Sequence, residues 1–188
     1  MRIVPQPHPL PDPQVWTVRG MALPGALASL LRTGGWLHPG QQALHDLMPW
    51  FEDPLMFMPD LHAMRFQNAF LDHIADDSSL CDLFRMTRGS RSGHPLGLPW
   101  LDVDQAVFIA VNEYAGDDVA LALDYRTDPA DPRVVASDFW TDPRQCSWRT
   151  VAPTFTDLLT ALQAAWSARS ERGVQQEGSR SAEQCADG

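Results

Sequence analysis

The sequence contains no lysine, so arginine supplies all of its positive charge. There are 14 arginines against 24 aspartates and glutamates, and the formal net charge at pH 7 is -10. Phosphates repel a surface of this sign, which opposes nonspecific binding to nucleic acid or to an anionic membrane. A basic protein surface would instead be attracted. The charge therefore favours another protein as the partner.

Long apolar runs and paired cysteines are also missing. No run approaches the roughly 20 residues that a membrane-spanning helix needs, and the start of the chain lacks the apolar core of a secretory signal. The three cysteines, Cys81, Cys146 and Cys185, are widely spaced and contain no C-x-x-C pattern. Such a set suits a reducing compartment better than a disulfide framework. These absences predict a cytoplasmic protein without a membrane span.

Short motifs with a known catalytic geometry are absent as well. No G-x-x-x-x-G-K-[ST] phosphate-binding loop occurs. The segment "GSRSG" places Arg91, rather than a serine, at the centre of the pattern that presents a nucleophile. The histidines form no H-x-x-x-H pair. The sequence therefore predicts a protein that is not an enzyme and that binds no cofactor.

The chain divides into an arm, one domain and a tail. Residues 5–13 alternate proline with other residues, which indicates an extended arm over residues 1–20. Residues 167–188 contain few side chains that could be buried and predict a disordered tail. Between them, residues 21–166 are long enough for a single domain with its own core.

The first half of the domain has the spacing of helices. The segment 23–35 places Pro24 at the first helical position, and Gly34 and Gly35 stop that helix. Asp60 is in place to cap a later helix. The elements expected after the first helix are a helix at 40–48, a short buried strand at 55–58 and a helix at 61–75.

The second half of the domain has the spacing of strands. Alternating runs occupy 105–114, 117–125 and 133–140, and residues that favour turns connect them. A closing helix is expected over 154–166, with Thr154 and Asp157 at its start. Helices followed by a meander predict an α+β fold, with a mainly antiparallel sheet and helices packed on one side.

Residues 115–140 concentrate acidic side chains around two short apolar runs. The aspartates in this stretch are Asp117, Asp118, Asp124, Asp128, Asp131 and Asp138. Asp118 and Asp124 flank a strand and would lie about 20 Å apart if it is extended, too far to share one ion. Asp128 and Asp131 sit beside prolines, where aspartate caps its own turn. These carboxylates are interpreted as turn and edge residues that charge a surface.

A metal site is one alternative to this interpretation. Asp76 and Asp77 follow His73 by one helical turn, a spacing that supports one side of a metal site. No second pair of matching spacing follows. These residues, or alternatively the carboxylates of 117–124, define a metal-dependent hydrolase as an alternative function.

An anion site is a second alternative. Arg85, Arg88 and Arg91 lie in a segment that also contains glycine and serine. Guanidinium groups and glycine amides suit a phosphate. The segment therefore defines an anion-binding or small-ligand-binding regulatory domain as an alternative, beside its interpretation as a solvated connector.

The tryptophans divide into core candidates and loop candidates. Trp100 and Trp166 belong to apolar faces and are expected in the core. The tryptophans in or beside expected loops are Trp36, Trp50, Trp140 and Trp148. Large aromatic side chains in loops are typical anchors of protein interfaces, although a loop also tucks such a side chain under itself.

The order of elements resembles the SUKH superfamily, the Smi/Knr group. The segments "GDDVALALDY", "DPRVV", a tryptophan and "WRTVAPTFTDLLTAL" are similar to its C-terminal half, and "LPGALASLLRTGG" is similar to an earlier helix-and-glycine element. By position, Gly116 and Asp117 correspond to a turn, Asp124 to a strand end, and Thr154 and Phe155 to the start of the closing helix. The resemblance covers about 98–165 and, more loosely, 21–60.

This resemblance implies an α+β fold and no enzymatic activity. Bacterial members of the superfamily are associated with immunity proteins that neutralise toxins, and fungal members act as regulatory interaction scaffolds. Together with the charge, it predicts a non-catalytic cytoplasmic module that binds another protein, such as a toxin with a basic surface. The expected contact residues are Tyr114, Asp117, Asp118, Trp140 and Trp148.

Overall fold

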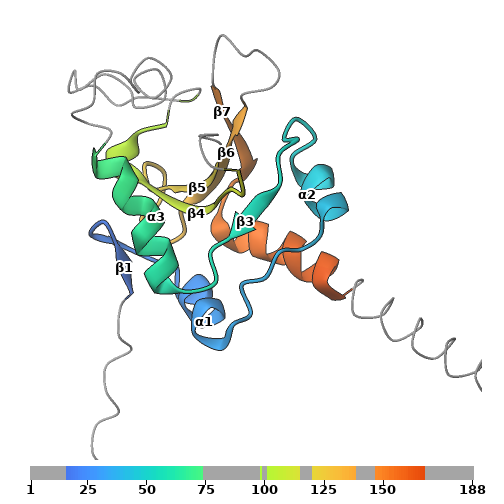
Figure 1. Ribbon diagram of the computed structural model, residues 1–188, viewed down its shortest axis with the longest axis horizontal. Helices are drawn as coiled ribbons and strands as arrows, with labels where there is room; N and C mark the ends of the chain where they lie inside the picture. Colours follow the sequence, from blue (N-terminus) through green and yellow to red (C-terminus); the bar gives the residue numbers. More distant parts are fainter. Residues whose placement is uncertain (1–15, 74–97, 99–100, 115–119, 139–146, 168–188) are drawn as a thin grey trace, which may run out of the picture.

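A five-stranded antiparallel sheet forms the centre of the molecule (Figure 1). The computed structural model describes residues 16–73, 98, 101–114, 120–138 and 147–167. The strands are β3 (Leu55–Phe57), β4 (Ala106–Asn112), β5 (Ala120–Asp124), β6 (Arg133–Asp138) and β7 (Ser147–Ala152), in that order across the sheet. The other elements are β1 (Thr17–Val18), β2 (Met21–Ala22), α1 (Gly25–Thr33), α2 (Gln41–Leu47), α3 (Leu61–His73), η1 (Val103–Gln105) and a closing helix over 155–167. The predicted α+β class is confirmed.

The strand register separates the two faces of the sheet. One row of paired residues crosses all five strands on one face: Phe57, Ala110, Leu121, Ala136 and Arg149. Every residue of β5 is nevertheless buried. The alternation predicted for this strand therefore sets which face a side chain takes, and does not separate buried from exposed positions.

Local sequence signals place α1 close to its predicted bounds. Gly34 has a φ of 69° in the left-handed region, which favours glycine, and the Gly35 N–H donates to the Leu30 carbonyl at 2.8 Å. These features end the helix as predicted. Pro24 lies one residue before the helix, not at its first position, because its ψ of 136° is extended.

Side-chain caps begin the two later helices. Asp60 Oδ1 accepts a hydrogen bond from the Ala63 N–H at 2.8 Å, as its position predicts. In the closing helix, Thr154 Oγ1 accepts from the Asp157 N–H at 3.0 Å. Asp131 adds a second cap from the β5–β6 connection, since its Oδ1 accepts from the Thr156 N–H at 3.1 Å. Asp131, which was predicted to cap its own turn, therefore caps the start of the closing helix.

The closing helix packs on the face of the sheet that carries Phe57. Trp36, in the segment after α1, lies 4.9 Å from the Phe57 ring and 6.0 Å from the Phe155 ring, centroid to centroid. Its indole N–H donates to the Ile109 carbonyl at 3.3 Å. Trp166 meets it edge to face. Trp36 thus joins segments that are far apart in the sequence.

Two of the tryptophans expected as loop anchors are in the core. Trp36 is 2% exposed and Trp148 is 3% exposed, so neither offers contact area to a partner. The expectation for Trp148 is therefore wrong. It lies in β7, where its ring stacks on Phe108 of the same sheet face at 6.0 Å between centroids. Other predictions from the sequence concern residues that the structure does not describe, namely 1–15, Ile74, Trp100, Trp140 and 168–188.

Replacement by phenylalanine is expected to change the free energy of unfolding differently at these two buried tryptophans. Trp36 Nε1 has an acceptor, whereas Trp148 Nε1 is buried and no described residue accepts a hydrogen bond from it. Trp36→Phe removes a hydrogen bond and leaves a small cavity, so we expect a loss of about 2–3 kcal/mol in the free energy of unfolding. Trp148→Phe also removes an unsatisfied donor, and its loss is expected to stay below about 1 kcal/mol. Urea unfolding of both variants measures the difference, and equal losses would contradict it.

The N-terminal hairpin is tied to the rest of the fold by Arg19. Arg19 and Gly20 both have positive φ and form the turn between β1 and β2. The Arg19 guanidinium donates to the Val103 and Ala106 carbonyls and pairs with Asp72. The predicted boundary between arm and domain, at residues 20 and 21, falls within this hairpin. No described helix combines the length and the apolar character needed to cross a membrane.

Asn68 covers the part of β4 that β3 does not reach. β3 is short, and its last residue, Phe57, pairs with Ala110. Next to this pair, the Phe108 N–H donates to Asn68 Oδ1 at 2.8 Å, and Asn68 Nδ2 donates to the Phe108 carbonyl at 2.9 Å. A side chain of α3 thus replaces the missing strand residue and satisfies a buried strand edge.

Candidate partner-binding surface

One end of the sheet carries Tyr114 and the strand ends that flank the segments 115–119 and 139–146 in the sequence. The meander brings the end of β4 at Asn112, the start of β5 at Ala120, and the Asp138–Ser147 pair of β6 and β7 to the same end. The start of β3 joins them, because Leu55 pairs with Asn112. The segments 115–119 and 139–146 connect these strand ends. They contain Asp117, Asp118 and Trp140, which lie outside the described residues.

Tyr114 is the expected contact residue that the structure places at this surface. Its side chain is 61% exposed. Its backbone is fixed, because the Tyr114 N–H donates to Asn112 Oδ1 at 2.8 Å and Asn112 Nδ2 donates to Asp53 Oδ2 at 3.0 Å. The Glu113 N–H also donates to the Pro54 carbonyl at 3.0 Å. An exposed aromatic ring on such a backbone has the properties of an interface anchor.

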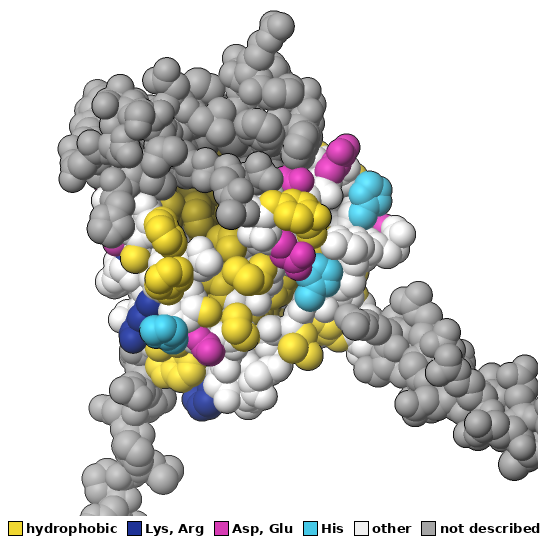
Figure 2. All heavy atoms as spheres, in the orientation of Figure 1, with side chains coloured by type: hydrophobic (Ala, Val, Ile, Leu, Met, Phe, Trp, Pro, Cys, Tyr) yellow, Lys and Arg dark blue, Asp and Glu magenta, His cyan; other side chains and the backbone are white. Residues whose placement is uncertain are grey.

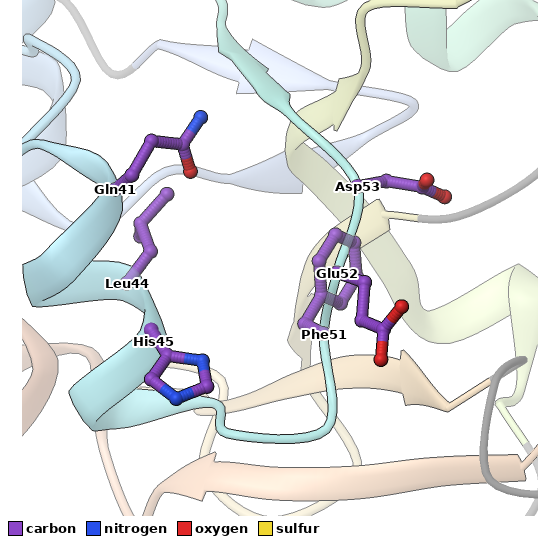
Figure 3. Close-up of a pocket in the computed structure, with 6 residues that line it drawn as sticks. All are labelled: Gln41, Leu44, His45, Phe51, Glu52 and Asp53. Atoms are coloured by element: carbon purple, nitrogen blue, oxygen red, sulfur yellow. The ribbon is translucent and has the colours of Figure 1, made fainter.

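A cavity of about 480 Å³ lies between α2 and the segment that leads into β3 (Figure 3). Its lining residues are Gln41, Leu44, His45, Phe51, Glu52 and Asp53. Figure 3 shows Leu44 and His45 directed from α2 toward the opposite wall, where the Phe51 ring lies. The Asp53 carboxylate points away from α2, which agrees with its hydrogen bond to Asn112. We call this cavity the α2 pocket.

The surface around the α2 pocket is acidic. Glu52 and Glu113 are exposed, and neither forms an ion pair within the described parts of the chain. Arg149 lies over the Trp50 ring at 5.4 Å from its centroid, and its charge is paired with Asp138. Figure 2 shows acidic and histidine side chains on the α2 side, and arginine side chains next to a further histidine and carboxylate on the other side of the same view.

The carboxylates of the acidic stretch have several different roles. Asp128 Oδ1 accepts from the Ala130 N–H at 2.8 Å, which confirms the predicted turn. Asp124 and Asp138 are 0% and 1% exposed, so the prediction that they charge a surface is wrong. Each is a buried ion-pair partner of arginine instead. A carboxylate at a strand end can be buried because its charge is compensated there.

Asp124 is held by two arginines. Arg126 donates to both of its carboxylate oxygens, at 2.8 and 2.7 Å, and Arg133 donates to Oδ2 at 2.8 and 2.7 Å. Burial would raise the pKa of the Asp124 carboxyl, but the hydrogen bonds from Arg126 and Arg133 outweigh it and lower the pKa below its ordinary value. Burial also raises the pKa of the neighbouring Tyr125, whose hydroxyl donates to the Ala22 carbonyl.

The residues of the two alternative functions lie largely outside the described residues. His73 is the last residue of α3, and its side chain, Asp76 and Asp77 are not described. Arg85, Arg88 and Arg91 are not described either. Across the ranges that the structure describes, no three His, Cys, Asp or Glu side chains come close enough together to hold a metal ion.

Several residues of this surface were not predicted from the sequence. Gln41, His45 and Glu52 belong to the α2 pocket, and Asn112 holds Tyr114 in place. The acidic pair in "WFEDP" is a weak signal for the pocket wall, because it lies between an aromatic pair and a proline.

Comparison of the chain with protein-family models, with curated proteins and with solved structures finds no match. The resemblance to the SUKH superfamily therefore rests on the sequence motifs alone.

Proposed function

We propose that the chain is a non-catalytic cytoplasmic module that binds a basic surface of another protein at the Tyr114 end of its sheet. The observation that carries the proposal is the exposed Tyr114 ring on a fixed backbone, next in the chain to Glu113. Neither Glu113 nor Glu52 forms an ion pair with another described residue. The SUKH-like order of elements and the net charge of -10 support it further. The scattered cysteines support a reducing compartment.

The surface suits a cationic partner for two physical reasons. A net negative charge steers a basic protein toward the molecule and accelerates association, and this effect weakens as salt rises. Once in contact, a large aromatic side chain that is already held in place loses little conformational freedom on binding. Charge therefore governs the rate of association, and Tyr114 slows dissociation.

A pull-down of the partner with the unmodified protein and with Tyr114→Ala tests this proposal. We expect the full-length tagged protein to capture a stoichiometric protein with a basic surface at low salt, and to lose it as salt rises. Tyr114→Ala should weaken the complex about tenfold or more, since anchor residues typically contribute at least 1–2 kcal/mol. The melting temperature should not change, because the side chain is 61% exposed.

Phe66→Ala is the matched control. Phe66 is 60% exposed on α3, where its ring meets Phe70 edge to face, and it lies outside the proposed surface. This variant should bind the partner as the unmodified protein does. Equal weakening by both substitutions would argue against the Tyr114 surface, and the absence of any protein partner at low salt would refute the module. A toxin among the captured proteins would establish an immunity role.

A further inference from the structure

We propose that the α2 pocket receives an arginine side chain of the partner protein. This inference rests on the proposed function and names the group that the partner inserts. The cavity of about 480 Å³ lies within the usual range for binding pockets and opens to solvent. Such a shape receives a protruding side chain and does not enclose a whole ligand.

The lining of the α2 pocket matches a guanidinium group in both of its properties. A guanidinium is flat, carries five N–H donors along its edge and has no acceptor. The Phe51 ring and the Leu44 side chain supply apolar surface for its faces and for the aliphatic stem. The Gln41 amide oxygen supplies an acceptor on the α2 side, and Glu52 supplies a negative charge at the opposite rim, where its carboxylate points away from α2 (Figure 3).

The charge around the pocket selects a cation over an anion. Among the described residues, Glu52 has no ion pair and no arginine lines the cavity. Arg149, which lies over Trp50, is already paired with Asp138. A phosphate or carboxylate in the pocket would meet the negative charge of Glu52, and among the lining residues only His45 could offset that charge. A guanidinium would compensate it.

The walls of the α2 pocket are held apart by hydrogen bonds at both ends of the 51–53 segment. The Met48 N–H donates to the Leu44 carbonyl at 2.7 Å, and the Phe51 N–H donates to the Met48 carbonyl at 3.0 Å, which fixes the turn after α2. At the other end, Asn112 binds Asp53. The cavity therefore exists before the partner arrives, which lowers the entropy lost on binding.

Titration with a short peptide tests the inference without the partner. The probe is the blocked tripeptide acetyl-Gly-Arg-Gly-amide, and the comparison probe carries citrulline, an uncharged isostere, in place of arginine. We expect the arginine peptide to bind with a Kd of about 1 mM. Amide NMR signals from 41–45 and 51–53 should shift as it binds. The citrulline peptide should bind at least about fivefold more weakly.

Two variants with the same change of charge separate the pocket from the general acidic field. Glu52→Gln should weaken the arginine peptide about three- to tenfold, since an exposed charged hydrogen bond is lost. Glu113→Gln removes the same charge at a residue that does not line the cavity, and its effect should stay below about twofold. Equal effects of the two variants, equal affinity of the two peptides, or shifts elsewhere in the chain would overturn the inference.

Failure of this inference is distinguishable from failure of the proposed function. A captured partner that is lost in Tyr114→Ala but retained in Glu52→Gln would leave the module intact and overturn the arginine pocket. The opposite pattern, peptide binding in the α2 pocket with no protein captured by the full-length chain, would overturn the proposed module. Loss of both the partner and the arginine peptide in Glu52→Gln would support the inference.

Discussion

Asp124→Asn is expected to lower the free energy of unfolding by about 3–5 kcal/mol, because it removes the negative charge that two largely buried guanidinium groups share. The Asp124 side chain is fully buried, and those of Arg126 and Arg133 are 9% and 20% exposed. Both arginines reach the carboxylate within 2.8 Å. Asparagine keeps the shape of the side chain, so the loss would come from the missing charge and one missing acceptor.

The position of Asp124 adds to this effect. It closes β5, and Arg133 is its direct partner at the start of β6. Repulsion between the two guanidinium groups would therefore act on the pairing of central strands as well as on the turn that follows. A substitution in an exposed loop would not disturb the pairing of central strands in this way.

The pH dependence of stability provides an independent measurement. The folded-state pKa of Asp124 is lowered, so its contribution is present above the unfolded pKa of about 3.9 and is lost as the pH falls through the folded value. The difference in stability between the unmodified protein and Asp124→Asn should therefore be constant near neutral pH. It should narrow as the pH falls below about 4.

Urea unfolding followed by tryptophan fluorescence measures both effects. Asp128→Asn is the matched control, because Asp128 is exposed and an asparagine oxygen can still accept from the Ala130 N–H. Its effect should stay within about 0.5 kcal/mol. Similar losses in the two variants, or a difference that does not change with pH, would contradict the role assigned to Asp124.

The fold was predictable wherever local signals and tertiary packing agree. Pro24, Gly34 and Asp60 act within a few residues of their own helices, so the sequence predicts those helix ends closely. β7 had no such signal. It is an edge strand, and its consecutive residues Arg149 and Thr150 are both exposed, which removes the alternation that identifies a strand.

The candidate site was predictable only in part, because burial depends on distant residues. Tyr114 and Trp148 both carry large aromatic side chains near strand ends, but one is exposed and the other is stacked on Phe108. That stacking partner is 40 positions away in the sequence. Asp124 was assigned to a surface for the same reason, since its burial depends on compensation by Arg126 and Arg133. No property of the single residue distinguishes these cases.

The same limit applies to Asn68, and it leads to the second large effect. A polar residue in the middle of a helix is typical of an exposed face, yet Asn68 is fully buried. Asn68→Leu is expected to lower the free energy of unfolding by about 3–5 kcal/mol, because the Phe108 N–H and carbonyl would both stay buried without these partners. Leucine has a similar volume, so a cavity does not explain the loss.

Amide hydrogen exchange locates this effect on the strand edge. In the unmodified protein the Phe108 N–H is bonded to a side chain that also donates to the Met64 carbonyl at 2.9 Å, so α3 and β4 must separate before it exchanges. In Asn68→Leu, exchange of the Phe108 amide should accelerate by more than the loss in global stability explains. Leu121 and Leu123 of β5 pair with β4 on one side and with β6 on the other. Exchange of their amides should accelerate only as much as the loss in global stability predicts. A leucine variant as stable as the unmodified protein, with Phe108 still protected, would mean that β4 needs no partner at this position. The short β3 strand is compatible with a buried β4 edge only if Asn68 supplies the missing hydrogen bonds, and this variant tests that requirement directly.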